Sequence, residues 1–340
     1  MDRRHFRLGF AGFGNVGRAL ARLLLERRGE LERRHDLTFE VTLLASARRG
    51  ALVEPAGIDL EASLRDGWSS SGRLPDALGT APVDVLFEAT PLEPRTGQPA
   101  LSHVRAALER GISVVTANKG PVAAAARDLF AIARRTGAGF RFESAVADCM
   151  PVFNLVEAAV PVGRIVRCRG VLNSTSNHVL QAVGLGRPAD EAVAEMQRLG
   201  LAEADPSHDL EGWDQAVKIV MLANVLMGRD LKTTEVERTP LSSVDPAWLR
   251  GEALSGRTVR LIAEAGVDGP ARVRPEGMAP GDFLASLQGV SLGLTLDTEL
   301  AGTINVSSIE PHVEQTAYGM LADMVALRQG RRLVPTPLLT

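Results

Sequence analysis

Two carboxylates and an amine occur close together in the segment 203–218, which reads EADPSHDLEGWDQAVK. A helix that begins near Gly212 would place Asp214 and Lys218 four residues apart on one face. Glu203 would approach them from the loop that Pro206 interrupts. Three such groups could bind a small zwitterion. The alternative is an exposed helix pair that contributes on the order of a few tenths of a kcal/mol, and two further motifs bear on the choice.

A glycine-rich turn lies near the N-terminus, where residues 8–17 read LGFAGFGNVG. A β-rich segment beginning near Phe6 leads into G-x-G-x-x-G, and a helix-forming segment follows. Gly12 permits a tight turn, Gly14 lets the backbone approach a pyrophosphate, and Gly17 lets helix and strand pack closely. This context predicts dinucleotide binding, whereas the alternative is a packing turn of another α/β domain. The predicted cofactor residues of the turn are Gly12, Phe13, Gly14, Asn15, Val16 and Gly17.

The second predicted strand, residues 39–45, is followed by Ser46, Ala47, Arg48 and Arg49. An Asp or Glu at the end of this strand would bind the ribose 2′-hydroxyl of NAD, and none is present. A hydroxyl and two guanidinium groups instead favour the 2′-phosphate of NADP. We therefore predict that Ser46, Arg48 and Arg49 contact the cofactor and that NADP is preferred. The alternative is that both arginines are solvated loop charges, and NAD stays open as the cofactor.

Lys119 is expected at the carboxyl end of a strand formed by the β-branched run 114–116, before an Ala-rich helix that opens at Pro121. Upstream, residues 84–88 form another buried-type strand, whose following turn would line the same crevice. Ligands of open parallel sheets collect beyond such strand ends, so the amine of Lys119 could reach cofactor and substrate together. The alternative for this residue is a surface lysine. The cofactor candidates of the two loops are Thr90, Pro91, Asn118 and Lys119.

The three regions together resemble homoserine dehydrogenase, whose pattern includes a glycine-rich N-terminal turn, a T-A-N-K segment and an E-x-D-P-x-x-D-x-x-G-x-D-x-x-x-K segment. The likeness extends through 87–91 (FEATP), 111–119 (GISVVTANK) and 170–177 (GVLNSTSN), and covers most of residues 6–230. Only a loose likeness continues into the carboxyl-terminal third. The resemblance implies a nicotinamide cofactor and a small amino-acid substrate, L-homoserine or L-aspartate 4-semialdehyde.

The resemblance also implies roles for individual residues. Lys218 and Lys119 correspond to catalytic lysines, and Glu203 and Asp214 to the carboxylates that hold the ammonium group of the substrate. Because a hydride passes between the nicotinamide and the substrate carbon, a proton must enter or leave the substrate oxygen. A lysine, with a pKa of about 10.4 when free, is an adequate acid for aldehyde reduction and needs a lowered pKa to act as a base. Which lysine transfers the proton stays open. Further implied substrate contacts, in matching loops, are Asn173, Thr175 and Gly200.

Two departures from the family pattern lie in these regions. Ser174 and His178 stand where the family usually has Gly and Tyr, and Ser174 is expected to tighten the pocket. Residues 147–150 (ADCM) replace a small, glycine-rich step. The resemblance implies that a monovalent cation binds here through backbone oxygens, and Asp148 would strengthen or reshape that site. The residues of the implied cation site are Glu143, Val146, Asp148 and Met150.

The largest departure is the segment 308–319 (SIEPHVEQTAYG), which replaces a run of glycine and alanine that approaches the cofactor in many family members. Glu310 is therefore the cofactor candidate of a loop with different chemistry. His312 is a weaker catalytic candidate, because a histidine that follows proline in a loop is usually exposed or satisfied locally.

The composition indicates a two-domain cytoplasmic enzyme. A chain of 340 residues with 45% hydrophobic residues can bury a large core. Its net charge of −3 provides no general attraction to nucleic acid. Cys149 and Cys168 are too few for a disulfide framework, which suits a reducing compartment. We expect neither export nor membrane insertion, because the N-terminus lacks the apolar core of a signal peptide and no apolar run reaches the ~20 residues of a membrane span.

Strand and helix patterns alternate as far as residue 142, with helices expected at 98–110 and 122–136 and strands at 112–116 and 139–143. This alternation predicts an α/β fold with a Rossmann-type doubly wound parallel sheet. The later pattern predicts a mixed α+β substrate domain, which by resemblance also carries the contact of a homodimer. Too few residues follow Leu327 for an appended regulatory domain. The expected boundaries are 1–149 for the nucleotide-binding domain, 150–310 for the substrate-binding and dimerisation domain, and 311–340 for a C-terminal helix that returns to the nucleotide-binding domain.

We predict an enzyme that reduces L-aspartate 4-semialdehyde to L-homoserine, in the branch of the aspartate pathway that leads to threonine and methionine. One alternative is a dehydrogenase of the same fold that acts on another small amino or hydroxy acid, favoured if the altered loops reject homoserine. The other is a cofactor-binding sensor without turnover. The missing glycine-rich loop motivates that alternative, and the intact lysines and carboxylates oppose it.

Overall fold

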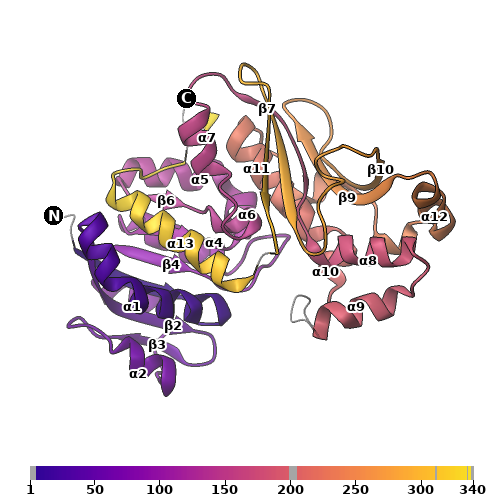
Figure 1. Ribbon diagram of the computed structural model, residues 1–340. Helices are drawn as coiled ribbons and strands as arrows, with labels where there is room; N and C mark the ends of the chain where they lie inside the picture. Colours follow the sequence, from indigo (N-terminus) through magenta and orange to yellow (C-terminus); the bar gives the residue numbers. More distant parts are fainter. Residues whose placement is uncertain (1–4, 199–204, 311, 335, 338–340) are drawn as a thin grey trace. The chain divides into compact units, whose positions relative to one another are not determined.

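The computed structural model describes residues 5–198, 205–310, 312–334 and 336–337 (Figure 1). The chain divides into two compact units. The first unit comprises Met1–Glu157 and His312–Thr340, and the second comprises Ala158–Pro311. In the described part of the chain, no helix combines the length and the apolar character needed to cross a membrane.

A six-stranded sheet with the order β3-β2-β1-β4-β5-β6 forms the centre of the first unit. All neighbouring pairs from β2 to β6 are parallel, which confirms the predicted doubly wound fold. Every residue of β4 is buried, as expected for a parallel strand covered on both faces. The strands are β1 (His5–Ala11), β2 (Thr38–Ser46), β3 (Gly50–Val53), β4 (Val85–Glu88), β5 (Ser113–Thr116) and β6 (Phe140–Arg141). The helices are α1 (Asn15–His35), α2 (Leu60–Arg65), α3 (Leu74–Thr80), α4 (Ala100–Glu109), α5 (Lys119–Thr136), α6 (Ser144–Ala147), α7 (Phe153–Ala159) and α13 (Val313–Arg328).

Strand β3 is the exception to the parallel pattern, because it pairs antiparallel with β2 at the edge of the sheet. Only the turn 47–49 separates the end of β2 from the start of β3. A parallel connection needs a crossover of about a dozen residues, so a turn this short permits only the antiparallel arrangement. The turn contains Arg48 and Arg49 and therefore presents both of them at the carboxyl end of β2.

Helix α13 packs against α1 within the first unit. Met320, Met324 and Leu327 lie three or four residues apart and join the core cluster that contains Leu20 and Leu24 of α1. This spacing places them on one face of α13, so the helix buries an apolar stripe against the nucleotide-binding fold.

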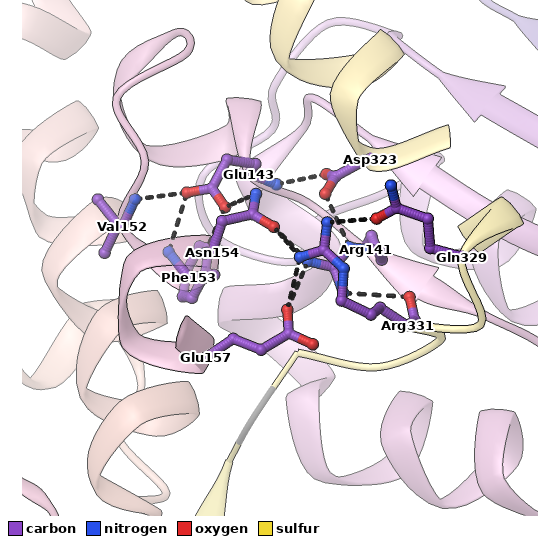
Figure 2. Close-up of polar contacts among 9 residues, drawn as sticks. All are labelled: Arg141, Glu143, Val152, Phe153, Asn154, Glu157, Asp323, Gln329 and Arg331. Atoms are coloured by element: carbon purple, nitrogen blue, oxygen red, sulfur yellow. Dashed lines mark hydrogen bonds and ion pairs between the residues drawn. The ribbon is translucent and has the colours of Figure 1, made fainter. Parts of the chain in front are cut away.

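Buried polar groups also connect α13 to the end of β6 (Figure 2). Arg141 and Asp323 are both 0% exposed, and Nε of Arg141 donates to Oδ1 of Asp323 at 2.9 Å. The other oxygen of Asp323 accepts from the backbone N of Glu143 at 2.8 Å. Nη2 of Arg141 donates to Asn154 at 2.8 Å and to Glu157 at 3.1 Å. One guanidinium therefore joins β6, α7 and α13.

The carboxylate of Glu143 binds the start of α7 (Figure 2). It accepts from the backbone N of Val152 at 2.5 Å, of Phe153 at 2.9 Å and of Asn154 at 2.8 Å. Burial and the nearby carboxylate of Asp323 raise the pKa of Glu143 to about 7, while these N–H donors favour its ionised form. The strand expected at 139–143 is shorter than predicted, because the chain leaves the sheet at Arg141 to make these contacts.

A second six-stranded sheet, with the order β12-β11-β7-β9-β10-β8, forms the centre of the second unit. Its neighbouring pairs are antiparallel except β8 with β10, and α8 and α11 pack against its strands, which confirms the mixed α+β prediction. The strands are β7 (Ile165–Val171), β8 (Glu237–Arg238), β9 (Thr258–Gly266), β10 (Arg272–Met278), β11 (Leu292–Thr298) and β12 (Thr303–Ser308). The helices are α8 (Ser174–Gly184), α9 (Ala189–Arg198), α10 (Ser207–Leu210), α11 (Trp213–Met227) and α12 (Pro246–Leu254), with short 3-10 turns at Thr233–Glu235 and Leu241–Ser243.

Replacing Asp323 by Ala should destabilise the first unit. The substitution leaves the buried guanidinium of Arg141 without its closest carboxylate, and breaking a buried ion pair costs about 3–5 kcal/mol. Chemical denaturation measures the loss. The control is Glu30→Ala, which breaks an exposed pair with Arg34 on α1 and should leave the denaturation midpoint almost unchanged. Equal midpoints for the two variants would contradict the anchoring role of Asp323.

Candidate active site

The glycine-rich turn lies between β1 and α1 in the first unit. Gly12 has φ of +97°, and a Cβ there would lie 2.5 Å from the carbonyl oxygen of Ala89. A Cβ on Gly17 would lie 2.5 Å from the carbonyl oxygen of Gly12, so these two positions need glycine for the turn to form. A Cβ on Gly14 would meet nothing within 4 Å, which leaves space for a ligand beside the backbone. Among the described residues, no side chain caps the N-terminus of α1, and the N–H groups of its first turn suit a pyrophosphate.

Phe13 contributes to this turn differently from its neighbours. Its side chain is 8% exposed and packs edge-on against the rings of Phe10 and Trp68, with centroid distances of 5.6 and 5.3 Å. Only the backbone of Phe13 is therefore placed to meet a cofactor. Asn15 is exposed and Val16 is partly buried in the first turn of α1.

The two arginines that are predicted to contact the 2′-phosphate of NADP, Arg48 and Arg49, differ in their surroundings. The backbone N of Gly12 donates to the carbonyl of Ala45 at 2.9 Å, which places the end of β2 beside the glycine turn. Arg49 donates to the carbonyl of Trp68 at 3.2 Å, and its backbone N donates to Oγ of Ser46 at 3.1 Å. Arg48 is exposed and makes no hydrogen bond or ion pair with another described residue. Arg48 is thus the arginine better placed to bind an added phosphate.

The loops after β4 and β5 lie beside this turn. The backbone N of Ala89 donates to Ala11 at 2.8 Å, and the backbone N of Ala117 donates to Glu88 at 3.0 Å. The side-chain amide of Asn118 donates to the carbonyls of Thr90 at 3.0 Å and Pro91 at 3.3 Å. The structure therefore brings together the predicted cofactor residues of these loops and of the glycine turn, all within the first unit.

Helix α5 begins at Lys119 rather than at Pro121. The side chain of Asn118 accepts from the backbone N of Gly120 at 3.0 Å and caps the helix, a preference that asparagine shares with Ser, Thr and Asp. Lys119 accordingly lies in the first helical turn, at the carboxyl end of β5 as predicted.

Asp214 and Lys218 form a buried pair in the second unit. Helix α11 begins directly after Gly212, as predicted, and Nζ of Lys218 lies 2.8 Å from Oδ2 of Asp214. Nζ also donates to the carbonyl of Leu172 at 2.5 Å. The side chains of Asp214 and Lys218 are only 12% and 11% exposed, so the alternative of an exposed helix pair is wrong.

Asn173 organises the carboxylates around this pair. Its amide nitrogen donates to Asp214 at 3.0 Å and to Asp209 at 2.7 Å. Its amide oxygen accepts from the backbone N of Ser176 at 2.9 Å and caps α8. Thr175, in the first turn of that helix, is buried. Asp209 was not singled out from the sequence, although it occupies the second Asp of the motif that contains Asp214 and Lys218.

The remaining predicted substrate residues, Gly200 and Glu203, lie outside the described residues. Glu310, in the second unit, is exposed and has φ of +48°. His312, in the first unit, is exposed and contacts the carboxylate of Glu314 at 2.9 Å, so it is satisfied locally.

Ser174 and His178, the two residues of α8 that depart from the family pattern, have partners within the second unit. Oγ of Ser174 donates to the carbonyl of Val290 at 2.5 Å, and Nε2 of His178 lies 3.3 Å from Glu195. Neither residue contacts Asp214 or Lys218 through these bonds.

The segment of the implied cation site folds into α6 and a sharp turn. Asp148 has φ of +54°, and its carboxylate accepts from Oγ1 of Thr316 at 2.6 Å. The carboxylate of Glu143 is occupied by α7. The described residues hold no cluster of three or more His, Cys, Asp or Glu side chains suited to a metal ion. Backbone oxygens are thus the ligands that this segment offers.

Comparison with known proteins supplies an independent result. The homoserine dehydrogenase family model matches residues 151–325, and the homoserine dehydrogenase NAD-binding domain model matches residues 12–143. The chain belongs to the homoserine dehydrogenase family. The resemblance found in the sequence motifs is thereby confirmed.

Relatives of similar length support this assignment. The NAD(+)-dependent homoserine dehydrogenase of Pseudomonas canavaninivorans is 34% identical, over 95% of this chain and 96% of the relative. The homoserine dehydrogenase of Methanocaldococcus jannaschii is 31% identical, over 92% and 96%. A crystal structure of a putative homoserine dehydrogenase from Archaeoglobus fulgidus has a TM-score of 0.85 and 30% identity, and covers 95% of this chain and 99% of that chain. A hyperthermophilic archaeal homoserine dehydrogenase in complex with NADPH has a TM-score of 0.83 and 25% identity, over 98% and 99%.

Proposed function

We propose that this homoserine dehydrogenase family member catalyses the NADP-dependent interconversion of L-homoserine and L-aspartate 4-semialdehyde, in the pathway branch that leads to threonine and methionine. The observation that carries the proposal is the buried cluster of Lys218, Asp214 and Asn173, with the carbonyl of Leu172 as a further partner. A desolvated lysine beside a carboxylate suits both the binding of an amino acid and the transfer of a proton.

The glycine turn fits a dinucleotide, because Gly12 and Gly17 permit its shape and the space beside Gly14 is open. When bound, the nicotinamide cofactor supplies and accepts the hydride. The backbone of residues 12–17 binds the pyrophosphate, and Thr90, Pro91 and Asn118 line the sheet edge beside it. In this proposal Glu310 also contacts the nicotinamide half.

Lys218 and Lys119 are the acid–base residues of the proposal. Oδ2 of Asp214 lies 2.8 Å from Nζ of Lys218, and in this proposal Asp214 and Glu203 bind the ammonium group of the substrate. A protonated lysine donates its proton to the substrate oxygen when the aldehyde is reduced. In the reverse direction the neutral amine accepts the proton from the hydroxyl when the alcohol is oxidised. Asn173, Thr175 and Gly200 complete the substrate loops.

The preference for NADP rests on the first unit. No Asp or Glu occurs in the turn 47–49 that follows β2. Arg48 is exposed in that turn, at the carboxyl end of β2. The named relatives leave the choice open, because the Pseudomonas enzyme is NAD(+)-dependent and the archaeal structure contains NADPH.

A monovalent cation bound by the backbone oxygens of Glu143, Val146, Asp148 and Met150 is a further part of the proposal. The positive φ of Asp148 supports it, since the reversal of the chain there turns successive carbonyls out of the helical direction. Turnover should fall when sodium and potassium are exchanged for tetramethylammonium at equal ionic strength, and unchanged turnover would remove the cation from the proposal.

We further propose a cytoplasmic homodimer built on the second unit. Strand β12 is an edge strand, and its residues 303–307 alternate between exposed and partly buried, which supports an edge available to a second copy. Light scattering on the purified protein measures its mass, and a monomer at micromolar concentration would contradict the dimer.

The decisive experiment follows nicotinamide absorbance while the purified protein oxidises L-homoserine with NADP and then with NAD, at mildly alkaline pH. Homoserine-dependent reduction of the cofactor is expected. Absence of reduction with both cofactors, in protein shown to be folded, would favour another small amino or hydroxy acid or a sensor without turnover.

Lys218→Ala should lower kcat by about 10²–10⁴-fold, the usual contribution of a general acid or base. The dissociation constant for NADPH should change far less, because the substitution lies in the second unit and the nucleotide turn in the first. Lys232→Ala, at an exposed lysine of the same unit, is the matched control. A near-normal rate for Lys218→Ala would overturn its assigned role.

Arg48→Ala should raise the Michaelis constant for NADP roughly tenfold, since a hydrogen bond to a charged group contributes about 1.5–3 kcal/mol. The constant for NAD should hardly change, because NAD lacks the 2′-phosphate. Arg135→Ala, at an exposed arginine in the last turn of α5, controls for the loss of one positive charge. Parallel increases for both cofactors would exclude Arg48 from phosphate recognition.

A further inference from the structure

Glu88, the last residue of β4, is a buried carboxylate without a cationic partner. It is 0% exposed and forms no ion pair with any described residue. Its partners are neutral donors: the backbone N of Thr90 at 2.9 Å, Oγ1 of Thr90, and Oγ1 of Thr116 at 2.6 Å. Burying such a group is costly unless its hydrogen bonds are made, so this arrangement needs a reason other than packing.

The partners of Glu88 belong to the two loops that follow β4 and β5. Oγ1 of Thr116 accepts from the backbone N of Asn118 at 2.9 Å. The side-chain amide of Asn118 donates back to the carbonyl of Thr90 at 3.0 Å. A closed ring of hydrogen bonds therefore runs from Glu88 to Thr90, Asn118 and Thr116 and returns to Glu88.

This ring determines the positions of the proposed cofactor residues in both loops. Thr90 is held through its backbone and its hydroxyl, and Pro91 follows it with its carbonyl bound by Asn118 at 3.3 Å. Asn118 also caps α5 through the backbone N of Gly120, and Lys119 lies between these two residues. Movement of one loop would break bonds to the other, so the loops are fixed as a pair.

We infer that Glu88 is a positioning residue, which holds Thr90, Asn118 and Lys119 in the arrangement that receives the nicotinamide half of the cofactor. The inference rests on the proposed function, in which these loops contact the cofactor. In this inference Glu88 acts on the cofactor site only through its hydrogen-bond partners, Thr90 and Thr116.

A carboxylate is the side chain that matches this ring. Its two oxygens accept from three donors at once, whereas a glutamine has one acceptor oxygen and an amide that donates. Thr116 can accept from that amide with its second lone pair and turn its own proton toward the carbonyl of Asn118, 3.3 Å away. Glutamine can therefore preserve the ring in an altered form, while an apolar residue cannot.

The test compares Glu88→Gln and Glu88→Leu with the wild type by fluorescence titration of NADPH in the absence of substrate, and by kcat. Glu88→Leu should weaken NADPH binding about tenfold or more and lower kcat about a hundredfold, since a shift of about 1 Å in a reacting group has that effect. Glu88→Gln should recover most of the binding. The wild-type titration also tests the proposed cofactor site separately.

Thr42→Val is the matched control. It removes a buried hydroxyl of the same sheet, which donates to the carbonyl of Pro82 at 2.7 Å, away from both loops. This variant should lower the thermal midpoint and leave the dissociation constant for NADPH unchanged. In the cofactor-free protein, amide hydrogen exchange at Thr90, Asn118 and Gly120 should be faster in Glu88→Leu than in Thr42→Val.

Thr116→Val provides a second route if Glu88→Leu fails to fold. It keeps the side-chain shape but removes the hydroxyl between Glu88 and Asn118, and it should weaken NADPH binding in the same direction. A folded Glu88→Leu or Thr116→Val that binds NADPH as tightly as the wild type, with a lowered thermal midpoint only, would overturn the inference. Failure of the wild type to bind either cofactor would instead contradict the proposed function.

Discussion

One row of paired residues across the sheet of the first unit determines where the proposed cofactor residues lie. Ala45, Ala11, Glu88 and Thr116 are neighbours in parallel register on β2, β1, β4 and β5. Because parallel strands point the same way, the chain leaves the sheet at the same edge on all four strands. The first proposed cofactor residue on each of these strands or in the loop after it lies within two residues of this row, at Ser46, Gly12, Thr90 and Asn118. A shift of one strand by one residue would separate its loop from the others and turn the side chains of that strand to the opposite face of the sheet.

Buried ionisable groups at three places among the described residues have different kinds of partner, and the differences separate scaffold from site. Arg141 and Asp323 neutralise each other and are closed to solvent, so their pair holds β6, α7 and α13 together. Glu88 has neutral donors only, which suits a group that shapes loops rather than balances a charge. Lys218 has a carboxylate partner and keeps 11% of its side chain exposed. Of the three, Lys218 keeps the largest exposed fraction, which suits the substrate contact that we propose for it.

The departures from the family pattern at Ser174 and His178 leave the cluster of Lys218, Asp214 and Asn173 intact. Ser174 binds the carbonyl of Val290 and His178 pairs with Glu195, while Asn173 still bridges Asp209 and Asp214. Because Ser174 and His178 bind partners outside the cluster, neither residue adds an unpaired polar atom to it. The two substitutions therefore change the loop without displacing the residues to which we assign the chemistry.

Features that depend on short stretches of chain could be read from the sequence alone. The pattern G-x-G-x-x-G with its flanking segments predicted the turn at 12–17, and a spacing of four residues on a helix predicted the contact of Asp214 with Lys218. Local geometry decides both, because neighbours in one turn or one helix are brought together by backbone dihedral angles. The family itself was recognised from the same local motifs.

Other features required the tertiary structure, because their partners are far apart in the chain. Arg141 and Asp323 are 182 residues apart, and Glu88 and Thr116 are 28 apart. Asp209 is connected to Asp214 through Asn173, 36 residues before Asp209. The ring of Phe13 packs against Trp68, so only its backbone is placed for the predicted cofactor contact. Composition and periodicity specify that a residue is buried, but not which polar atom it meets there. That choice is made by sheet register and helix packing, which place distant atoms at hydrogen-bond distance only in the folded chain.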